Sequence, residues 1–330
     1  METIRFLPGF VYGQLFTSLP KPEESAEGKT VIVTGSNVGL GLECARYFSK
    51  LGAAKVILAV RTIAKGNAAK EDIERSSGKK NVEVWELDLM SYASVKAFAR
   101  RVEKLPRLDA IIENAGISTF DFKIAEQDES TITTNVVSTF LLALLVLPKL
   151  RESAEKFGIL PHLVIVSSEV HFMTSFPEKA ADNIFEKLND EKTARMWDRY
   201  NVSKLIEVFI VRELVNVIAN KPADYKPNVV INFLNPGLCH SELVKVGGIT
   251  GMGVTLLKAA LARSTEYGSR TLVHAAHAGL ESHGQYLSNC RITPVAPMVT
   301  RPEGVAAQKK LWAELSQKLE SIQPGILNNI

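Results

Sequence analysis

Residues 30–41 read TVIVTGSNVGLG, and this stretch decides the fold of the chain. The β-branched run at 30–34 is typical of a strand that is buried on both faces. A turn follows at once, and apolar residues at helical spacing then continue to Leu51. The pattern is strand, turn, helix, with the turn formed by Gly35, Ser36, Asn37, Val38, Gly39, Leu40 and Gly41.

The glycine turn is suited to a phosphate ligand. Its glycines let the backbone approach a ligand closely, and free N–H groups at the start of the following helix favour a pyrophosphate. The spacing is G-x-x-x-G-x-G instead of the commoner G-x-G-x-x-G. A glycine motif alone is weak support for a nucleotide site, but its place between a strand and a helix strengthens it. We therefore expect a dinucleotide to bind here.

Strand and helix patterns alternate along the rest of the chain. Apolar strand patterns lie at 55–60, 82–87, 108–112, 163–166, 229–234 and 285–287, and helical patterns at 64–75, 95–105, 128–150, 200–219, 264–278 and 302–322. This alternation predicts an α/β fold with a doubly wound, parallel, Rossmann-like sheet in three αβα layers, built as a single domain. Ligands of such sheets bind at the carboxyl ends of the strands.

The chain is expected to extend this domain at both ends. Residues 1–27 form an N-terminal arm that packs on the domain or lies on a membrane surface, and packing is favoured because the arm lacks a basic face. Residues 28–300 form the domain, with a Gly-rich substrate lid at about 238–257. Residues 301–330 form a C-terminal helix and a tail, of which the last part, 324–330, is expected to be loose.

The composition fits a soluble globular protein. Of the 330 residues, 46% are apolar and 23% are charged, and the formal net charge is only +3, so no nucleic-acid partner is expected. Three dispersed cysteines cannot build a disulfide framework, which favours a reducing, cytoplasmic setting. The longest apolar run, 140–147, is far shorter than the ~20 residues that cross a bilayer, so no transmembrane segment is expected.

Polar residues follow several of the expected strands. Arg61 ends the strand at 55–60, where an arginine would accommodate the 2′-phosphate of NADP and an acidic residue would bind the ribose of NAD. Arg61 therefore favours NADP(H), with an ordinary loop cation as the alternative. Asp88 either accepts a hydrogen bond from adenine or caps the helix near Ser91. Asn135 is either a satisfied core amide or part of a functional polar network.

Tyr200 and Lys204 form a candidate proton-transfer pair. They lie four positions apart in a helical pattern, so their side chains share one face of the helix. A free phenol has a pKa of about 10 and needs a nearby cation to act near neutral pH. Lys204 can be that cation. Because Y-x-x-x-K alone is more often a solvated helix pair, the interpretation depends on the motifs around it.

Together, these motifs resemble those of the short-chain dehydrogenase/reductase family. The resemblance covers about residues 28–292. It is strongest with retinol-dehydrogenase-like members and with fungal reductases of specialised metabolism. The motifs that carry it are TGSNVGLG at 34–41, Asp88-Leu89, Asn114-Ala115-Gly116, Asn135, Ser167-Ser168, Tyr200-x-x-x-Lys204 and Asn235-Pro236-Gly237.

The resemblance implies a role for each position. Tyr200 would be the general acid in reduction and the base in oxidation, while Lys204 would lower its pKa and bind the nicotinamide ribose. Ser168 would hold the substrate carbonyl oxygen, and Asn135 would keep a water that relays protons past Lys204. Hydride addition builds an alkoxide, which needs such an acid and such donors. Cofactor contacts would come from the glycine turn, Arg61, Asp88, Leu89, Asn114, Ala115, Gly116, Tyr200, Lys204, Pro236, Gly237 and Ser241.

Two positions depart from the family pattern. Glu113 stands where asparagine is usual in N-N-A-G, so the turn over the cofactor is expected to differ slightly. Ser241 replaces the usual threonine after Pro-Gly, and its hydroxyl is expected to reach the nicotinamide amide still. Neither change removes a catalytic group.

The sequence therefore predicts an NADP(H)-dependent oxidoreductase. It would transfer a hydride between the nicotinamide and a bulky apolar ketone, aldehyde or secondary alcohol, in fungal secondary-metabolite biosynthesis. A membrane-associated retinoid or lipid dehydrogenase and a non-catalytic NADP(H)-sensing protein are the alternatives. No metal site is expected, because Cys239-His240 lacks a second pair at ligand spacing. A homodimer through 128–150 and 200–219 is implied by the resemblance, although core burial explains the apolar run equally well.

Overall fold

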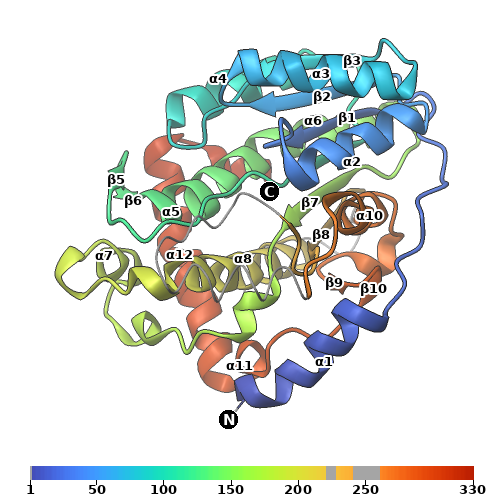
Figure 1. The fold of residues 1–330 in the computed structure, drawn as a ribbon. Coiled ribbons are helices and arrows are strands. Elements are labelled where there is room, and N and C mark those ends of the chain that lie inside the picture. The colour runs from blue at the N-terminus through green and yellow to red at the C-terminus, as the bar shows by residue number, and fades with distance from the viewer. Residues whose placement is uncertain (1, 221–227, 241–260) are drawn as a thin grey trace.

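The computed structural model describes residues 2–220, 228–240 and 261–330, and within them the chain builds an eight-stranded sheet (Figure 1). The strand order is β10-β9-β8-β7-β4-β1-β2-β3. The strands are β1 (Thr30–Thr34), β2 (Lys55–Val60), β3 (Val82–Glu86), β4 (Ala110–Glu113), β7 (His162–Val166), β8 (Val230–Asn235), β9 (Tyr286–Ser288) and β10 (Arg291–Ile292). The order confirms the predicted doubly wound sheet.

One edge of the sheet departs from the prediction of parallel strands. The short strand β10 pairs antiparallel with β9, while the other neighbouring pairs are parallel. Asn289 and Cys290 join the two strands with φ angles of 51° and 60°. Two consecutive left-handed residues make a tight hairpin turn, and neither is the glycine that would have signalled it in the sequence.

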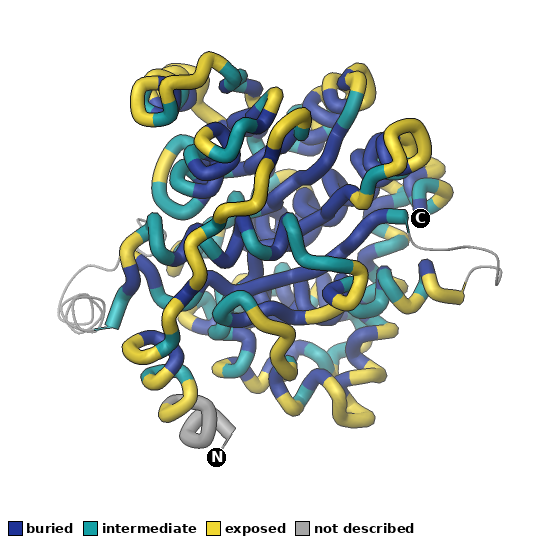
Figure 2. Tube along the Cα trace, turned by 90° about the vertical axis from the view of Figure 1, so that its right-hand side faces the viewer, coloured by how far each residue is buried: buried dark blue, intermediate teal, exposed yellow. Residues whose placement is uncertain are grey.

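Helices cover both faces of the sheet and complete the three layers (Figure 1). On one face lie α2 (Gly39–Lys50), α3 (Ile63–Ser77) and α10 (Thr265–Ala275), and on the other α4 (Tyr92–Val102), α6 (Thr139–Phe157) and α8 (Met196–Ala219). In β1, Val31 and Val33 enter the first core and Ile32 the second. Burial on both sides explains the unbroken apolar runs of these strands, which form the dark interior of Figure 2.

The helix expected at 128–150 has a different start. Residues Asp128–Glu129 form strand β6, which pairs with β5 (Ile124–Ala125). A short helix α5 (Ser130–Ile132) and a π-helical turn η1 (Thr133–Ser138) then lead into α6. A π-helical turn adds one residue to a turn of the helix. Residues 130–144 are all buried, so the segment has no one-sided apolar periodicity in which the extra residue could be detected.

Other elements surround this core. The irregular stretch before α8 holds short helices, and α8 begins at Met196, one turn before Tyr200. The N-terminal arm is largely helix α1 (Glu2–Phe16). Most of the predicted lid, and Ser241 with it, lies outside the described residues. The short helices are η2 (Glu169–Phe172), η3 (Pro177–Ala180), α7 (Ile184–Leu188), η4 (Glu191–Thr193), η5 (Leu280–Ser282) and α11 (Pro297–Thr300).

The C-terminal segment is docked along its whole length. Helix α12 (Pro302–Ile322) packs along α8, and the 3-10 helix η6 (Ile326–Asn329) packs on α6. Ile326 and Ile330 are buried, and Asn329 Nδ2 donates a hydrogen bond to the Leu144 carbonyl at 3.1 Å. The expectation of a loose tail at 324–330 was therefore wrong, because its isoleucines find an apolar surface that the sequence alone could not locate.

This packing also bears on the apolar run in α6. Within the described residues, Ser130–Phe157 is the one helical segment long and apolar enough to cross a membrane. Of its apolar 18-residue window, 94% is buried inside the protein. It is therefore a core helix. Helix α12 and η6 occupy part of the surface of α6 and α8 through which a homodimer was expected.

If the tail is docked, it should contribute to the free energy of unfolding. Ile326→Ala should lower the free energy of unfolding by about 2–4 kcal/mol, because it leaves a cavity beside α6. The matched control is Ile292→Ala, whose side chain is 47% exposed and whose loss should cost less than about 1 kcal/mol. Chemical denaturation of both variants measures the difference, and equal, small effects would contradict the docking of the tail.

Candidate active site

The glycine turn is held tightly between two neighbouring strands. Asn114 Nδ2 donates to the Thr34 carbonyl at 2.9 Å, and the Ala115 amide donates to Thr34 Oγ1 at 2.8 Å. A Cβ atom on Gly41 would lie 2.6 Å from Asn114 Nδ2 and 2.8 Å from the Gly35 carbonyl oxygen. Only glycine fits at position 41, so the ends of β1 and β4 and the start of α2 form one close-packed unit.

The start of α2 offers free backbone donors. Its N-cap residue is Val38, whose side chain makes no capping hydrogen bond and is 46% exposed. The Ser36 hydroxyl points inward and donates to the Val33 carbonyl at 2.7 Å. The first N–H groups of α2 are therefore left for a ligand, and a pyrophosphate is the group that such a helix end suits.

Arg61 and Asp88 lie at the carboxyl ends of the next two strands. Arg61 is exposed directly after β2 and makes no hydrogen bond or ion pair with another described residue. Asp88 Oδ1 accepts a hydrogen bond from the Met90 amide at 2.9 Å. The N-cap of α4 is Ser91, so the interpretation of Asp88 as that cap was wrong. Neighbouring Leu89 is buried.

Helix α8 brings Tyr200 and Lys204 together at the same edge. Lys204 Nζ lies 5.7 Å from the centre of the Tyr200 ring. Ser168 follows the end of β7, and its side chain lies near enough to the Tyr200 hydroxyl to work toward a lower pKa of that phenol. Lys204 Nζ also donates to the Val166 carbonyl at 2.9 Å. Tyr200 and Lys204 from α8 and Ser168 from the end of β7 thus lie close together.

Burial and neighbouring charges act in opposite directions on the pKa values of Tyr200 and Lys204. Burial raises the pKa of Tyr200, and the Lys204 ammonium acts in the opposite direction. Burial works to lower the pKa of Lys204, but the Glu207 carboxylate outweighs it and holds that pKa above its ordinary value. Lys204 is therefore charged, and it favours the phenolate of Tyr200.

Asn135 lies beside this group, in the π-helical turn. Its Oδ1 accepts from the Ile117 amide at 2.9 Å, and its Nδ2 donates to the Ile117 carbonyl at 2.9 Å and to Ser203 Oγ at 3.0 Å. A Cβ on Gly116 would lie 3.1 Å from Asn135 Oδ1 and 3.7 Å from Lys204 Nζ. Asn135 is thus a satisfied core amide. It also fixes the backbone next to Lys204, and its part in a functional network remains a prediction.

The comparisons with known proteins agree with this geometry. Residues 29–178 match the family model of the short chain dehydrogenases. The chain is 50% identical over 328 residues to the short chain dehydrogenase/reductase dmxR8 of Cryptosporiopsis sp. (strain 8999). The aligned region covers 97% of this chain and 99% of that protein. It belongs to the short-chain dehydrogenase/reductase family. The sequence-based prediction of the family is confirmed.

Further relatives and solved structures extend the match. The short-chain dehydrogenase anuD of Penicillium roqueforti is 44% identical over 321 residues, with 96% of this chain and 84% of that protein covered. A protein from Mycobacterium paratuberculosis superposes with a TM-score of 0.65 at 27% identity, over 90% of this chain and 95% of that one. A short chain dehydrogenase from Shigella flexneri complexed with NADP has the same fold, with a TM-score of 0.58 at 21% identity over 81% and 100% of the two chains.

The Asn235-Pro236-Gly237 motif of this dehydrogenase forms a fixed turn after β8. Asn235 Oδ1 accepts from the Gly237 amide at 2.8 Å, and Gly237 has a φ of 79°. Helix α1 fastens this turn, because Gln14 Nε2 donates to the carbonyl oxygens of Leu238 at 2.9 Å and Leu261 at 3.0 Å. No sequence signal identified Gln14, since its partners lie more than 200 positions away.

His171 holds the backbone of Ser168. Its Nε2 accepts from the Ala296 amide at 3.2 Å, so its Nδ1 carries the proton and donates to the Ser168 carbonyl at 2.7 Å. Burial lowers the pKa of His171 to about 4, which keeps the ring neutral. The side chain is structural: it holds the backbone of Ser168 in place.

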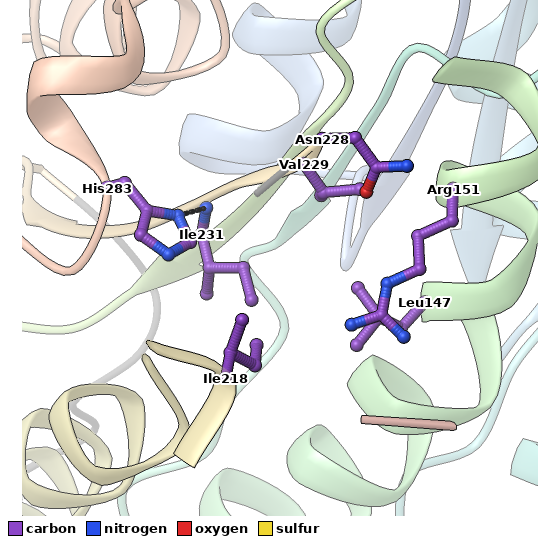
Figure 3. A pocket seen from close by; sticks show the side chains of 7 residues that line it. All are labelled: Leu147, Arg151, Ile218, Asn228, Val229, Ile231 and His283. Atoms are coloured by element: carbon purple, nitrogen blue, oxygen red, sulfur yellow. Dashed lines mark hydrogen bonds between the residues drawn. The ribbon is translucent and has the colours of Figure 1, made fainter. Parts of the chain in front are cut away.

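A separate small crevice is shown in Figure 3. It is lined by Val229, Ile231 and His283, among others, at the amino end of β8. His283 Nδ1 accepts a hydrogen bond from the Ile231 amide at 3.2 Å there. Tyr200, Lys204 and Ser168 lie at the carboxyl ends of the strands, so this crevice is not part of the candidate active site.

The close packing at Gly41 predicts a loss of cofactor binding on substitution. In Gly41→Ala the added methyl group would push Asn114 and the Gly35 carbonyl apart, and the affinity for a nicotinamide cofactor should fall roughly tenfold or more. Gly9→Ala is the control, because nothing lies within 4 Å of a Cβ added there. Isothermal titration calorimetry measures both, and unchanged affinity in Gly41→Ala would contradict this account of the turn.

Proposed function

We propose that this chain is an NADP(H)-dependent reductase of a bulky, apolar ketone or aldehyde, or a dehydrogenase of the corresponding alcohol. We place it in the cytoplasm and in fungal specialised metabolism, in keeping with its cysteine content and its fungal relatives. The observation that carries the proposal is the meeting of Tyr200, Lys204 and Ser168 beside the glycine turn. The presence of both Tyr200 and Lys204 disfavours a non-catalytic sensor.

The residues divide the chemistry as follows. The bound cofactor supplies or accepts the hydride. Ser168 donates a hydrogen bond to the substrate oxygen, and Tyr200 delivers a proton to that oxygen in reduction or removes it in oxidation. Lys204 stabilises the phenolate of Tyr200 electrostatically. Asn135 and Val166 hold Lys204 and its surrounding backbone in a fixed geometry, which spares reorganisation during the reaction.

The preference for NADP(H) rests on Arg61. The donor set fits a dinucleotide, since the uncapped start of α2 can take the pyrophosphate. Arg61 lies after the adjacent strand β2, and its guanidinium has no other partner among the described residues. A free, exposed guanidinium at this strand end can form forked hydrogen bonds with a 2′-phosphate.

Apolar side chains beside the catalytic group favour an apolar substrate. Met173, five positions after Ser168, is 50% exposed, and Trp197, one turn before Tyr200, is 67% exposed. Ligand pockets are lined mainly by apolar and aromatic side chains, so we propose these two residues as substrate contacts.

Arg61→Ala tests the choice of cofactor. The affinity for NADPH should fall by about tenfold or more, because a charge-assisted hydrogen bond contributes roughly 1.5–3 kcal/mol, while the affinity for NADH should stay within about twofold. Arg100→Ala, which removes an exposed arginine on α4, should change neither. Fluorescence titration gives both constants, and an equal loss for the two cofactors would contradict the phosphate-binding role.

Tyr200→Phe tests the chemistry. It removes only the hydroxyl group, so NADPH should bind with unchanged affinity while kcat for any reduced carbonyl falls by about 10²–10⁴-fold. A panel of bulky apolar ketones and aldehydes, followed by NADPH absorbance, provides the measurement. Activity that survives in Tyr200→Phe would exclude the tyrosine as the proton donor.

A further inference from the structure

A buried carboxylate lies against the catalytic lysine. Glu207 Oε1 accepts a hydrogen bond from Lys204 Nζ at 2.8 Å, and both side chains are almost fully buried. Glu207 follows Lys204 by three residues and Tyr200 by seven, so the three side chains lie in one stripe along α8. Lys204 is the middle member, between the phenol and the carboxylate.

A second buried carboxyl group approaches the same place from the sheet. Glu113 is the last residue of β4, pairs in register with Ile165 of β7, and is buried. Neither of its carboxyl oxygens, nor Oε2 of Glu207, has a hydrogen-bond partner among the described residues. One buried ammonium balances one negative charge, so a second unpaired carboxylate here would be very costly.

The two carboxyl groups therefore differ in ionisation. Burial raises the pKa of Glu113 well above its ordinary value, and the charge of Glu207 raises it further. Burial also raises the pKa of Glu207, to about 7, against the effect of the Lys204 ammonium. Glu207, which is hydrogen-bonded to Lys204, is therefore the one of the two that ionises first, while Glu113 keeps its proton to higher pH.

We propose that Glu207, backed by the neutral Glu113, is a positioning residue of this active site: it holds Lys204 from the side opposite Tyr200 and sets how strongly the lysine acts on the phenol. This inference rests on the proposed function and deepens it. An ionised Glu207 counteracts the field of Lys204 at Tyr200, whereas a neutral Glu207 leaves that field unopposed.

The other groups packed around the stripe do not supply a competing charge. From β7 and η1, the nearest polar side chains are the uncharged Ser167, Ser168 and Asn135. From η2, Glu169 is directed toward Ser288 at 3.4 Å, and the neutral His171 is held by backbone groups. Within the described residues, Tyr200, Lys204, Glu207 and Glu113 thus form the titrating set.

Glu207→Gln tests the proposal, because glutamine retains an acceptor for Lys204 and removes the charge. The tyrosinate absorbance of Tyr200 is obtained by subtracting the pH titration of the matching Tyr200→Phe variant. In Glu207→Gln the phenol should ionise about one to two pH units lower than in the wild type. The pH limb of kcat should move in the same direction, with KM nearly unchanged.

Two control variants make the result decisive. Glu155→Gln, an exposed glutamate on α6, should leave the titration in place. Glu207→Asp retains the charge on a shorter side chain and should give a shift smaller than that of Glu207→Gln; it also serves if the glutamine variant fails to fold. A Glu207→Gln titration that superimposes on the wild type, or a Glu207→Asp shift as large as that of Glu207→Gln, would overturn the proposal.

Glu113→Gln checks the second carboxyl group. A raised folded-state pKa gives stability that is present at low pH and is lost as the pH rises above the unfolded-state value of about 4.3. The melting temperature of Glu113→Gln relative to wild type should therefore rise between pH 4 and pH 8, and a pH-independent difference would show that Glu113 is not held neutral. The spectroscopic titration of Tyr200 needs no turnover. If the wild type reduced no substrate but the phenol still ionised at lower pH in Glu207→Gln, only the proposed function would be refuted.

Discussion

The burial of the Lys204 ammonium is the constraint on which the rest of the active site depends. A buried cation is stable only with close partners, and here these are the Val166 carbonyl at the end of β7 and the Glu207 carboxylate on α8. The contact with Glu207 lies within α8, whereas the contact with Val166 requires α8 to lie directly against the end of β7. That placement brings Tyr200 close to Ser168, so the contacts of a single buried lysine fix the position of the proposed proton donor and of the serine beside it.

The topology of the sheet then determines where a dinucleotide can bind. Strand β1 lies between β2 and β4, so the chain proceeds to opposite sides of β1 and leaves a crevice at the carboxyl ends. The Asn114 side chain links β4 to β1 by a hydrogen bond to the Thr34 carbonyl, and it fits there only because Gly41 has no side chain. The start of α2 and the Lys204 group therefore face the same edge, as hydride transfer between a bound cofactor and a carbonyl requires.

Local patterns in the sequence predicted much of this arrangement. The alternation of strands and helices gave the sheet, and the four-residue spacing of Tyr200 and Lys204 placed them on one helix face. Features that depend on distant partners were not predictable: the docking of Ile326 on the core, the link from Gln14 to Leu238, and the approach of Glu113 to Glu207. The π-helical turn at Asn135 was not predicted either, because all of its residues are buried and the segment has no one-sided apolar periodicity to interrupt.

The central claim is that this edge of the sheet transfers a hydride to a carbonyl carbon. The most direct test supplies the purified protein with NADPH that carries deuterium at the transferable position of the nicotinamide, together with a panel of bulky apolar ketones. Mass spectrometry of the products then follows the label. The account predicts an alcohol with one deuterium on the carbinol carbon, absent with Tyr200→Phe. A protein that binds NADPH yet yields no labelled alcohol from any ketone of the panel would contradict it.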